Sequence, residues 1–528
     1  MKRTTHVGLL LFIVAITLLV GSRLRMSVNP NFMFQEQYGL AYNFAPRLGA
    51  LCDPNPLKGL EGPTSNVTDQ RSLSLLYVVP TKLLRHSIDT YVLHRIIGVA
   101  FFALTLLGLW GLARTLSFTF FPTMLLLTTV GFSTQLISYL YESKLTITSA
   151  AWFTFLLLSL AALDSALRRQ NIRKATLLLF IFPLLIALSY ETYTVSRPLA
   201  VIALSLIGSY RLWCNDTRGY RLRFTTIFLG SAIFSGFILK LLHPGIRFDQ
   251  TLFEGRTESL VTPSGTLFGE WRETILARIK EVPAIFEWSP SYFSSETLSE
   301  AGSLELWLAL AAFAAVTIST LCGADARRSR EILEEHKRFY LMVVVLAGAA
   351  LTIPLLSITY IRGHRLFGLY ICGALLLAVL VHALLKSEYK TLRHGSILAT
   401  FLMVGVIVFY RTPLLLAWQP PAHFTPPFAH ETIAALRTLP LPETLTPRPD
   451  SVLVRICDEA VPPSWEHFWN AALYVSDYGC KLGGATTRLS CDCESREFTD
   501  GLRGIVCLSR TSRGSEVALT TRYIEITP

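Results

Sequence analysis

Long apolar runs alternate with short basic stretches along most of the chain. A helix needs about 20 predominantly apolar residues to cross a bilayer, or fewer when neighbours bury it. By this measure the sequence predicts about eleven transmembrane helices, near 7–22, 92–113, 116–134, 144–164, 175–190, 198–212, 224–242, 304–322, 339–360, 366–385 and 396–411. No small-residue cleavage pattern follows the first run, so we expect a retained first helix and not a signal peptide.

The basic residues predict the orientation of these helices. Clusters of Lys and Arg residues lie in alternate connections between the predicted helices. They comprise Arg168, Arg169, Arg173, Lys174, Arg211, Arg218, Arg221, Arg223, Arg327, Arg328, Arg330, Lys337, Arg338, Lys386, Lys390 and Arg393. Cytoplasmic loops carry such an excess, so we expect a cytoplasmic N-terminus in the cell inner (plasma) membrane. The rule also accounts for the net charge of +11, and no nucleic-acid partner is predicted. Three long segments, 23–91, 243–303 and 412–528, then lie outside.

The composition supports the same class, because 51% of the residues are hydrophobic and only 16% are charged, against about 25% in soluble domains. The fold class predicted is therefore an all-α polytopic membrane protein with a small C-terminal α+β extracytoplasmic domain. We place the transmembrane domain at 1–411 and the tail domain at 412–528. The tail is expected to begin with a proline-rich linker at 413–427, followed by a helix near 430–439 and strand-like runs at 451–457, 504–509 and 516–526.

Six of the nine cysteines fall on the outer side of this topology: Cys52, Cys457, Cys480, Cys491, Cys493 and Cys507. An even number of cysteines in an oxidising compartment indicates disulfides. Fifteen pairings are possible in principle. Cys52 either stays free or bridges the first loop to the tail domain. The close pair Cys491 and Cys493 has no His nearby, which favours disulfides over a metal site.

Ionisable residues beside transmembrane helices are candidates for function. Each also has a simpler interpretation: Glu142 next to Lys144 forms a local pair, a single loop carboxylate is solvated, and arginines anchor helices at the lipid headgroups. The collection on one face argues for function: Glu36, Glu142, Glu191, Arg197, Arg362, His364 and Arg365.

Four local patterns surround these residues. Residues 34–43 place Glu36 among aromatic and small residues after the first helix, and 141–144 open the fourth helix. Residues 188–191 end the fifth helix before an Arg-Pro pair that opens the sixth, and 360–365 form a basic turn. From the first to the tenth helix, the chain resembles the GT-C fold membrane glycosyltransferases, particularly bacterial protein mannosyltransferases and lipid A aminoarabinose transferases. One departure is that the acidic pair of the first loop here is Gln35-Glu36.

The resemblance implies a glycosyltransferase that moves a sugar from a polyprenyl-phosphate donor to an extracytoplasmic glycan, lipid or protein acceptor. Glu36 would be the general base, with Glu142 assisting. The donor phosphate would bind Arg197, Arg362 and Arg365, with His364 as a further candidate, since a guanidinium forms paired hydrogen bonds with phosphate. The aromatic-rich loop 243–303 would form a lid. The sequence does not identify a cofactor, and a divalent metal is the candidate considered. Membrane lipids are expected partners.

Three other interpretations stay open. An O-antigen-type polysaccharide polymerase or ligase would rely on arginines without a carboxylate after the first helix. A GT-C-like scaffold without catalysis is compatible with the single carboxylate at Glu36. A secondary transporter would need charged or broken helices at the midplane and an internal repeat. The predicted spans are mostly uncharged at their centres and show no repeat.

Overall fold

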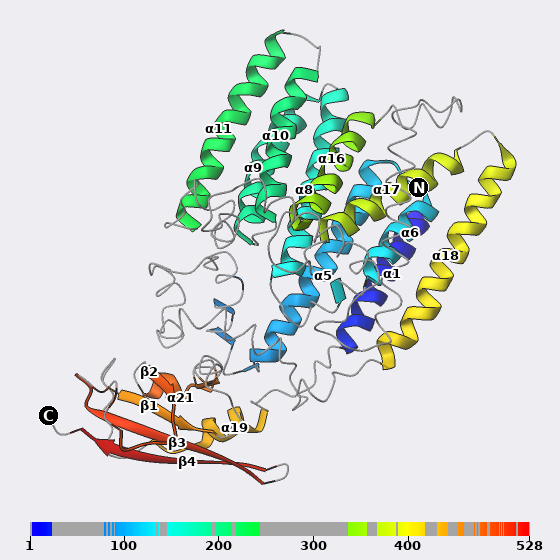
Figure 1. Cartoon of the computed structure of the whole chain (residues 1–528). Helices are drawn as coiled ribbons and strands as arrows, with labels where there is room; N and C mark the ends of the chain where they lie inside the picture. Colours follow the sequence, from blue (N-terminus) through cyan, green and yellow to red (C-terminus); the bar gives the residue numbers. More distant parts are fainter. Residues whose placement is uncertain are drawn as a thin grey trace, which may run out of the picture.

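The computed structural model is a bundle of long helices with a small sheet domain at one end (Figure 1). It describes residues 3–23, 76, 79–80, 83–84, 87–88, 90–133, 136–137, 145–169, 171–192, 196–213, 218–242, 336–355, 367–386, 389–417, 430–441, 452–458, 469, 472–473, 476–482, 486–495, 497, 499, 501–513 and 516–526.

Within these residues, ten helices fall on ten of the predicted apolar runs. They are α1 (Arg3–Arg23), α5 (Thr90–Thr115), α6 (Phe120–Gly131), α8 (Leu145–Arg168), α9 (Ile172–Thr192), α10 (Ser196–Trp213), α11 (Arg218–Leu242), α16 (Lys337–Leu355), α17 (Phe367–Leu385) and α18 (Lys390–Ala417). Six helices in the described part of the chain are long and apolar enough to cross a membrane. The predicted span at 304–322 lies outside the described residues. The chain is a polytopic membrane protein.

The last helix is longer than its sequence pattern predicts. We expect a linker from Pro413, but α18 continues through this proline to Ala417. A proline removes one backbone hydrogen bond and kinks a helix. Inside a bilayer, however, an unwound segment would leave several backbone groups unsatisfied. The apolar residues that follow Pro413 therefore stay helical, and the predicted start of the linker at Pro413 is too early.

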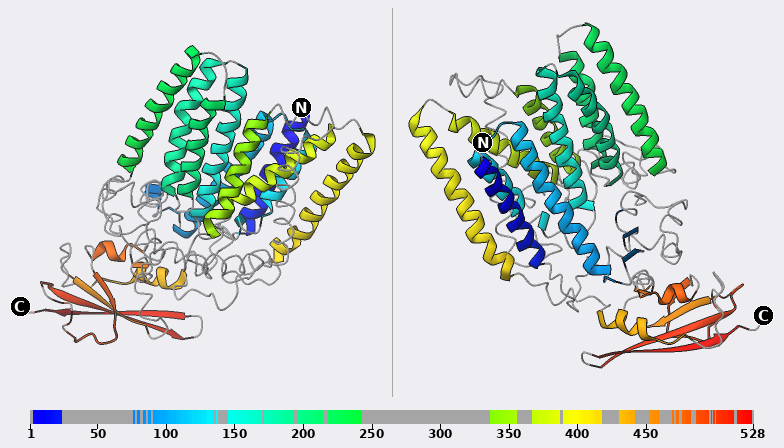
Figure 2. Two further views of the ribbon diagram at one scale, coloured as in Figure 1. Left: turned by 45° about the horizontal axis from the view of Figure 1, so that its top comes forward. Right: turned by 180° about the vertical axis from the view of Figure 1, so that it is seen from behind.

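α8 lies at the centre of the helical body. It packs against α5, α9, α16 and α17, and most of its face is buried, including Ile147, Phe153, Leu156 and Leu160. α17 is buried on nearly all sides. A helix that is apolar all round is expected where protein or lipid surrounds it completely. α8 and α17 therefore form the inner layer, and α1, α11 and α18 lie at the outside (Figures 1 and 2).

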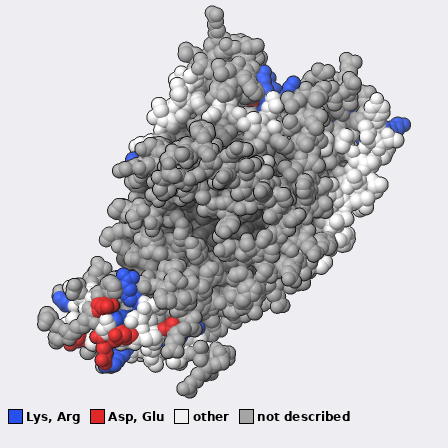
Figure 3. Space-filling model, viewed as in Figure 1, with Lys and Arg blue, Asp and Glu red and all other residues white. Residues whose placement is uncertain are grey.

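One end of the bundle is marked by ring contacts between helix ends. The ring of His6, near the start of α1, lies edge-on to Trp110 near the end of α5, with centroids 6.0 Å apart. Phe118, between α5 and α6, lies 5.2 Å from the ring of His382 near the end of α17. We call this the basic end, because the described connections here hold Arg168, Arg169, Arg173, Lys174, Lys337, Arg338, Lys386 and Lys390. Lys and Arg are visible at the upper end of the helical body in Figure 3.

The opposite end, which we call the tail end, is where α18 finishes and the chain continues to the sheet domain (Figure 1). The sheet domain lies beyond this end in all three ribbon views, and the N-terminus lies at the basic end (Figure 2). α1 and α18 thus both run from the basic end to the tail end (Figures 1 and 2).

The sheet domain has four strands in the order β2-β1-β3-β4: β1 (Val452–Cys457), β2 (Thr486–Leu489), β3 (Gly504–Arg513) and β4 (Glu516–Glu525). β1 is parallel to both β2 and β3, whereas β3 and β4 form an antiparallel hairpin. A strand between two parallel neighbours is buried on both faces and reads as a continuous apolar run, which explains the buried Val452, Leu453 and Val454 of β1.

Two helices complete the described part of this domain. α19 (His430–Thr438) packs against β4, and the short α21 (Tyr478–Lys481) lies between β1 and β2 in sequence. The predicted helix and the three predicted strands are confirmed as α19, β1, β3 and β4. The sequence prediction missed β2, whose four residues are too few to show an apolar alternation.

Candidate functional site

Of the predicted catalytic and phosphate-binding residues, Arg197 alone lies in the described part of the chain. Glu191, from the same collection of charged residues, is in the last turn of α9. Arg197 is in the first turn of α10, at the tail end. The other catalytic and phosphate-binding candidates lie outside the described residues: Glu36, Glu142, Arg362, His364 and Arg365. The same holds for the disulfide candidate Cys52. These assignments stay predictions.

Arg197 is buried, with 3% of its surface exposed. Its guanidinium carbon lies 5.6 Å from the ring centroid of Tyr190, in the last turns of α9, which is the geometry of a cation–π contact. Pro198 fits the same first turn, because proline lacks an N–H that this turn would leave unbonded. The α9–α10 hairpin therefore holds the guanidinium against a buried aromatic ring.

Arg197 lies at the start of a helix, which is a favourable place for an anion. The first backbone N–H groups of a helix point outward without helical partners and carry a partial positive charge. A cation there is disfavoured, whereas an anion is stabilised both by the helix start and by the guanidinium. The neighbouring polar side chains Ser189 and Thr192 are fully buried, and the hydroxyl of Thr192 donates to the Leu188 carbonyl at 2.6 Å. The start of α10 is thus a polar, sheltered place in an apolar body.

The sequence analysis missed two further buried arginines near the tail end. Arg95, in the second turn of α5, is 3% exposed, and Arg411, in the last turns of α18, is 4% exposed. Arg411 donates a hydrogen bond to the backbone carbonyl of Phe132, just after α6. This bond holds α18 on α6. The available signal was their position inside predicted spans, where a charge is unusual.

A second polar cluster lies at the basic end, between α8 and α16. Asp164 has a fully buried carboxylate, and it accepts a hydrogen bond from the Arg168 guanidinium at 3.1 Å. Another nitrogen of this guanidinium lies 2.7 Å from Nδ1 of His336, which is itself 3.7 Å from the carboxylate. These groups balance one another's charge in a buried place, and they join the end of α8 to the residue that precedes α16. Their arrangement is that of a structural network.

The cysteines of the sheet domain form disulfides, as predicted. Cys457 at the end of β1 is bonded to Cys491, and Cys493 is bonded to Cys507 of β3. Cys480 is disulfide-bonded as well. In the described part of the chain, no group of three or more His, Cys, Asp or Glu side chains could hold a metal ion. The two disulfides confirm the predicted preference at Cys491 and Cys493.

Comparison with known proteins gives matches in structure. No protein-family model matches the chain, and no curated protein matches its sequence. A crystal structure of the Archaeoglobus fulgidus oligosaccharyltransferase, in complex with zinc and sulfate, is similar with a TM-score of 0.50 at 10% identity, over 94% of this chain and 67% of that one.

Two further solved structures have the same kind of likeness. The oligosaccharyltransferase AglB from Archaeoglobus fulgidus, in complex with an inhibitory peptide and a dolichol-phosphate, has a TM-score of 0.48 at 9% identity, over 94% of this chain and 69% of that one. ArnT from Cupriavidus metallidurans in the apo state has a TM-score of 0.48 at 11% identity, over 98% of each chain. At these identities a likeness concerns the fold alone. The chain shares the GT-C fold with the oligosaccharyltransferase.

Proposed function

We propose that this chain is a glycosyltransferase that moves a sugar from a polyprenyl-phosphate carrier to an acceptor at the non-cytoplasmic face of the membrane. The acceptor class is a glycan, a lipid or a protein. In this proposal the tail end of the bundle faces away from the cytoplasm, and the basic end faces the cytoplasm of a cell whose inner membrane holds the protein. The fold supports the reaction class, because it is shared with an oligosaccharyltransferase.

The observation that carries the proposal is the buried Arg197 at the start of α10. A polyprenyl carrier places its phosphate at the headgroup level, next to apolar helices that accept its chain. A guanidinium forms short, charge-assisted hydrogen bonds with phosphate oxygens. As the sugar leaves, negative charge grows on the phosphate, and a fixed cation stabilises this charge in the transition state. Arg197 is positioned at the tail end for this role.

The remaining roles follow from the sequence. Glu36 is the proposed base that takes the proton of the acceptor as it attacks the anomeric carbon, and Glu142 orients the acceptor or binds a divalent metal. Arg362 and Arg365 share the donor phosphate with Arg197, and His364 adjoins them. The sugar–phosphate bond breaks as the new glycosidic bond forms, and the carrier leaves as its phosphate.

Binding of a polyprenyl monophosphate to the purified protein in nanodiscs tests the role of Arg197. Hydrogen bonds to a charged group are worth about 1.5–3 kcal/mol each, so we expect Arg197→Ala to weaken binding about 10- to 100-fold, with partial recovery in Arg197→Lys. Arg173→Ala, at an exposed position of the basic end, is the matched control and should bind normally. Unchanged binding in a folded Arg197→Ala protein would exclude Arg197 as a phosphate ligand.

A second experiment tests the base and separates the rival reaction class. Glu36→Gln keeps the shape of the side chain but cannot accept the acceptor proton, so sugar transfer should fall by about 100-fold or more while polyprenyl phosphate still binds. Near-normal transfer in Glu36→Gln would argue against this base. A polysaccharide polymerase or ligase that relies on arginines would give that result.

A further inference from the structure

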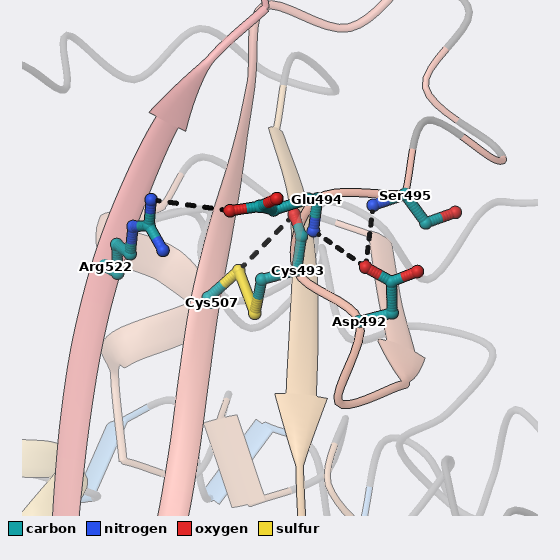
Figure 4. Close-up of polar contacts among 6 residues, drawn as sticks. All are labelled: Asp492, Cys493, Glu494, Ser495, Cys507 and Arg522. Carbon is teal, nitrogen blue, oxygen red and sulfur yellow. Dashed lines mark hydrogen bonds and ion pairs between the residues drawn. A yellow bond between two sulfur atoms is a disulfide. The ribbon is translucent and has the colours of Figure 1, made fainter.

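Two disulfides in the sheet domain link one loop to the neighbouring strands. The loop after β2 begins with Cys491 and Cys493, whose partners Cys457 and Cys507 belong to β1 and β3. Asp492 lies between the two cysteines and accepts hydrogen bonds from the backbone N–H groups that follow it, each at 3.0 Å (Figure 4). These two disulfides are complete within the domain.

Cys480 forms a third disulfide whose partner is none of these four. It lies in α21, and it is disulfide-bonded. Each of the other four cysteines of this domain already has its partner. The sequence holds four more cysteines, which are Cys52, Cys214, Cys322 and Cys372. Cys372 is a free thiol buried in α17.

The directions of the helices exclude Cys214. α9 starts at the basic end, directly after α8, and its last turns contact the first turn of α10 through Tyr190 and Arg197. α10 therefore starts at the tail end and finishes at the basic end with Trp213. Cys214 is the next residue. The sheet domain leaves α18 at the other end of the bundle, and the two sulfurs of a disulfide require Cα atoms within about 7 Å.

Cys322 is excluded by charge and by sequence position. It precedes a run that contains Arg327, Arg328 and Arg330, and this run leads to α16, which starts at the basic end beside Arg168. An arginine-rich connection of this kind stays on the cytoplasmic side, where thiols are kept reduced. We therefore expect Cys322 on the side of the membrane opposite to Cys480.

We propose that Cys480 is bonded to Cys52. Cys52 belongs to the segment between the end of α1 and the start of α5, and both of these helix ends are at the tail end, since His6 and Trp110 meet at the basic end. The segment thus leaves and re-enters the bundle at the end where the sheet domain lies. Forming the bond removes two protons and two electrons from the two thiols and reduces the disulfide of a dithiol–disulfide oxidant in that compartment.

The bond ties the sheet domain to the first outer segment. A cross-link between residues far apart in sequence lowers the conformational entropy of the unfolded chain by a large amount. If Glu36 is the base, as in the proposed function, the same bond fixes the tail domain to the segment that carries the base. The bond itself is independent of that function, and its test measures no sugar transfer.

Peptide mapping of the full-length protein without reductant tests the pairing. Trypsin releases Cys52 between Arg47 and Lys58, and Glu-C cleavage after Glu459 and Glu466 separates Cys457 from Cys480. After blocking of free thiols, we expect one disulfide-linked pair of peptides, 48–58 with 467–481. A blocked, unlinked Cys480, or a link from Cys480 to the peptide of Cys214 or Cys322, would overturn the proposal.

Substitutions provide an independent readout. In Cys480→Ser, alkylation of Cys52 in denaturant should rise from near zero to one label per chain, and Cys52→Ser should free Cys480 in the same way. Cys372→Ser is the control, because Cys372 is already free and its loss should leave Cys52 unlabelled. Cys52 that is fully labelled in the unsubstituted protein would also exclude the bond.

Discussion

The packing of α5 against α8 predicts the effect of a single added methyl group. α5 packs against α8, and a Cβ added to Gly108 would lie 2.8 Å from Cγ2 of Thr154. Thr154 is fully buried, and its hydroxyl donates to the Ala150 carbonyl at 2.7 Å. Rotating Thr154 away would break this hydrogen bond. Small residues let helices approach closely in membranes, and Gly108 therefore sets the spacing of α5 and α8.

The size of the effect follows from two opposing contributions. Replacing a helical glycine with alanine stabilises a helix by about 0.5–1 kcal/mol, because the glycine backbone loses more entropy on folding. Forcing a methyl group into a packed core costs about 1–3 kcal/mol. Gly348 in α16 has no atom within 4 Å of its added Cβ, so Gly348→Ala should show the gain alone. We expect Gly108→Ala to be less stable than Gly348→Ala by about 1–3 kcal/mol.

Thermal unfolding in one detergent, followed by intrinsic fluorescence, compares the two variants directly. Gly108→Ala should unfold at a lower temperature than Gly348→Ala. Thr154→Ser removes the methyl group that the new Cβ would meet, and in the Gly108→Ala background it should recover stability relative to its effect alone. Equal unfolding temperatures for both alanine variants, without any rescue by Thr154→Ser, would refute the close packing of α5 on α8.

Three further predictions concern the ion network and the sheet domain. Asp164→Asn should destabilise the protein by about 1–3 kcal/mol and so lower its unfolding temperature. Breaking a fully buried ion pair costs about 3–5 kcal/mol, and the smaller value is expected here because the Arg168 side chain is 28% exposed; an unchanged unfolding temperature would contradict the network. The disulfide between Cys457 and Cys491 closes a loop of 34 residues. Replacing both cysteines with serine should destabilise the sheet domain by about 4 kcal/mol on the chain-entropy account. Limited proteolysis should then cleave this domain faster, and equal cleavage rates would contradict the prediction. Burial raises the pKa of the Tyr478 phenol from 10.0 to about 12. The unfolded chain therefore loses this proton at a lower pH than the folded one, and the stability of the domain should fall as pH rises from about 10 to about 12. In unfolding measured as a function of pH, Tyr478→Phe should remove this part of the fall in stability.

The sequence predicted much of the fold because each signal is local. An apolar run of membrane length must become a helix in a bilayer, since no water is present to bind its backbone. Ten described helices accordingly lie on the predicted runs. Their orientation in the membrane, predicted from the flanking basic residues, stays a prediction. The buried strand β1 was found for a similar reason, because its continuous apolar residues identify it. β2 and the extension of α18 past Pro413 were missed, since their existence depends on neighbours.

The candidate site was predictable only as a set of residues. The Arg-Pro pair in the sequence identified Arg197, but its burial and its contact with Tyr190 come from the packing of α9 on α10. Arg95 and Arg411 were missed because a single charge in an apolar run does not show whether it faces lipid, protein or water. The same limit applies to His336, whose partners Asp164 and Arg168 are distant in sequence.

The sequence by itself determined that the chain crosses a membrane repeatedly, which ends of its helices carry the positive charge, and that its tail cysteines form disulfides. Those properties depend on how each short segment interacts with its solvent. The tertiary structure alone decided which cysteines pair, which arginines are buried and which helices touch. Those properties depend on distances between residues far apart in the chain, and the distances exist only after the helices and the sheet have packed.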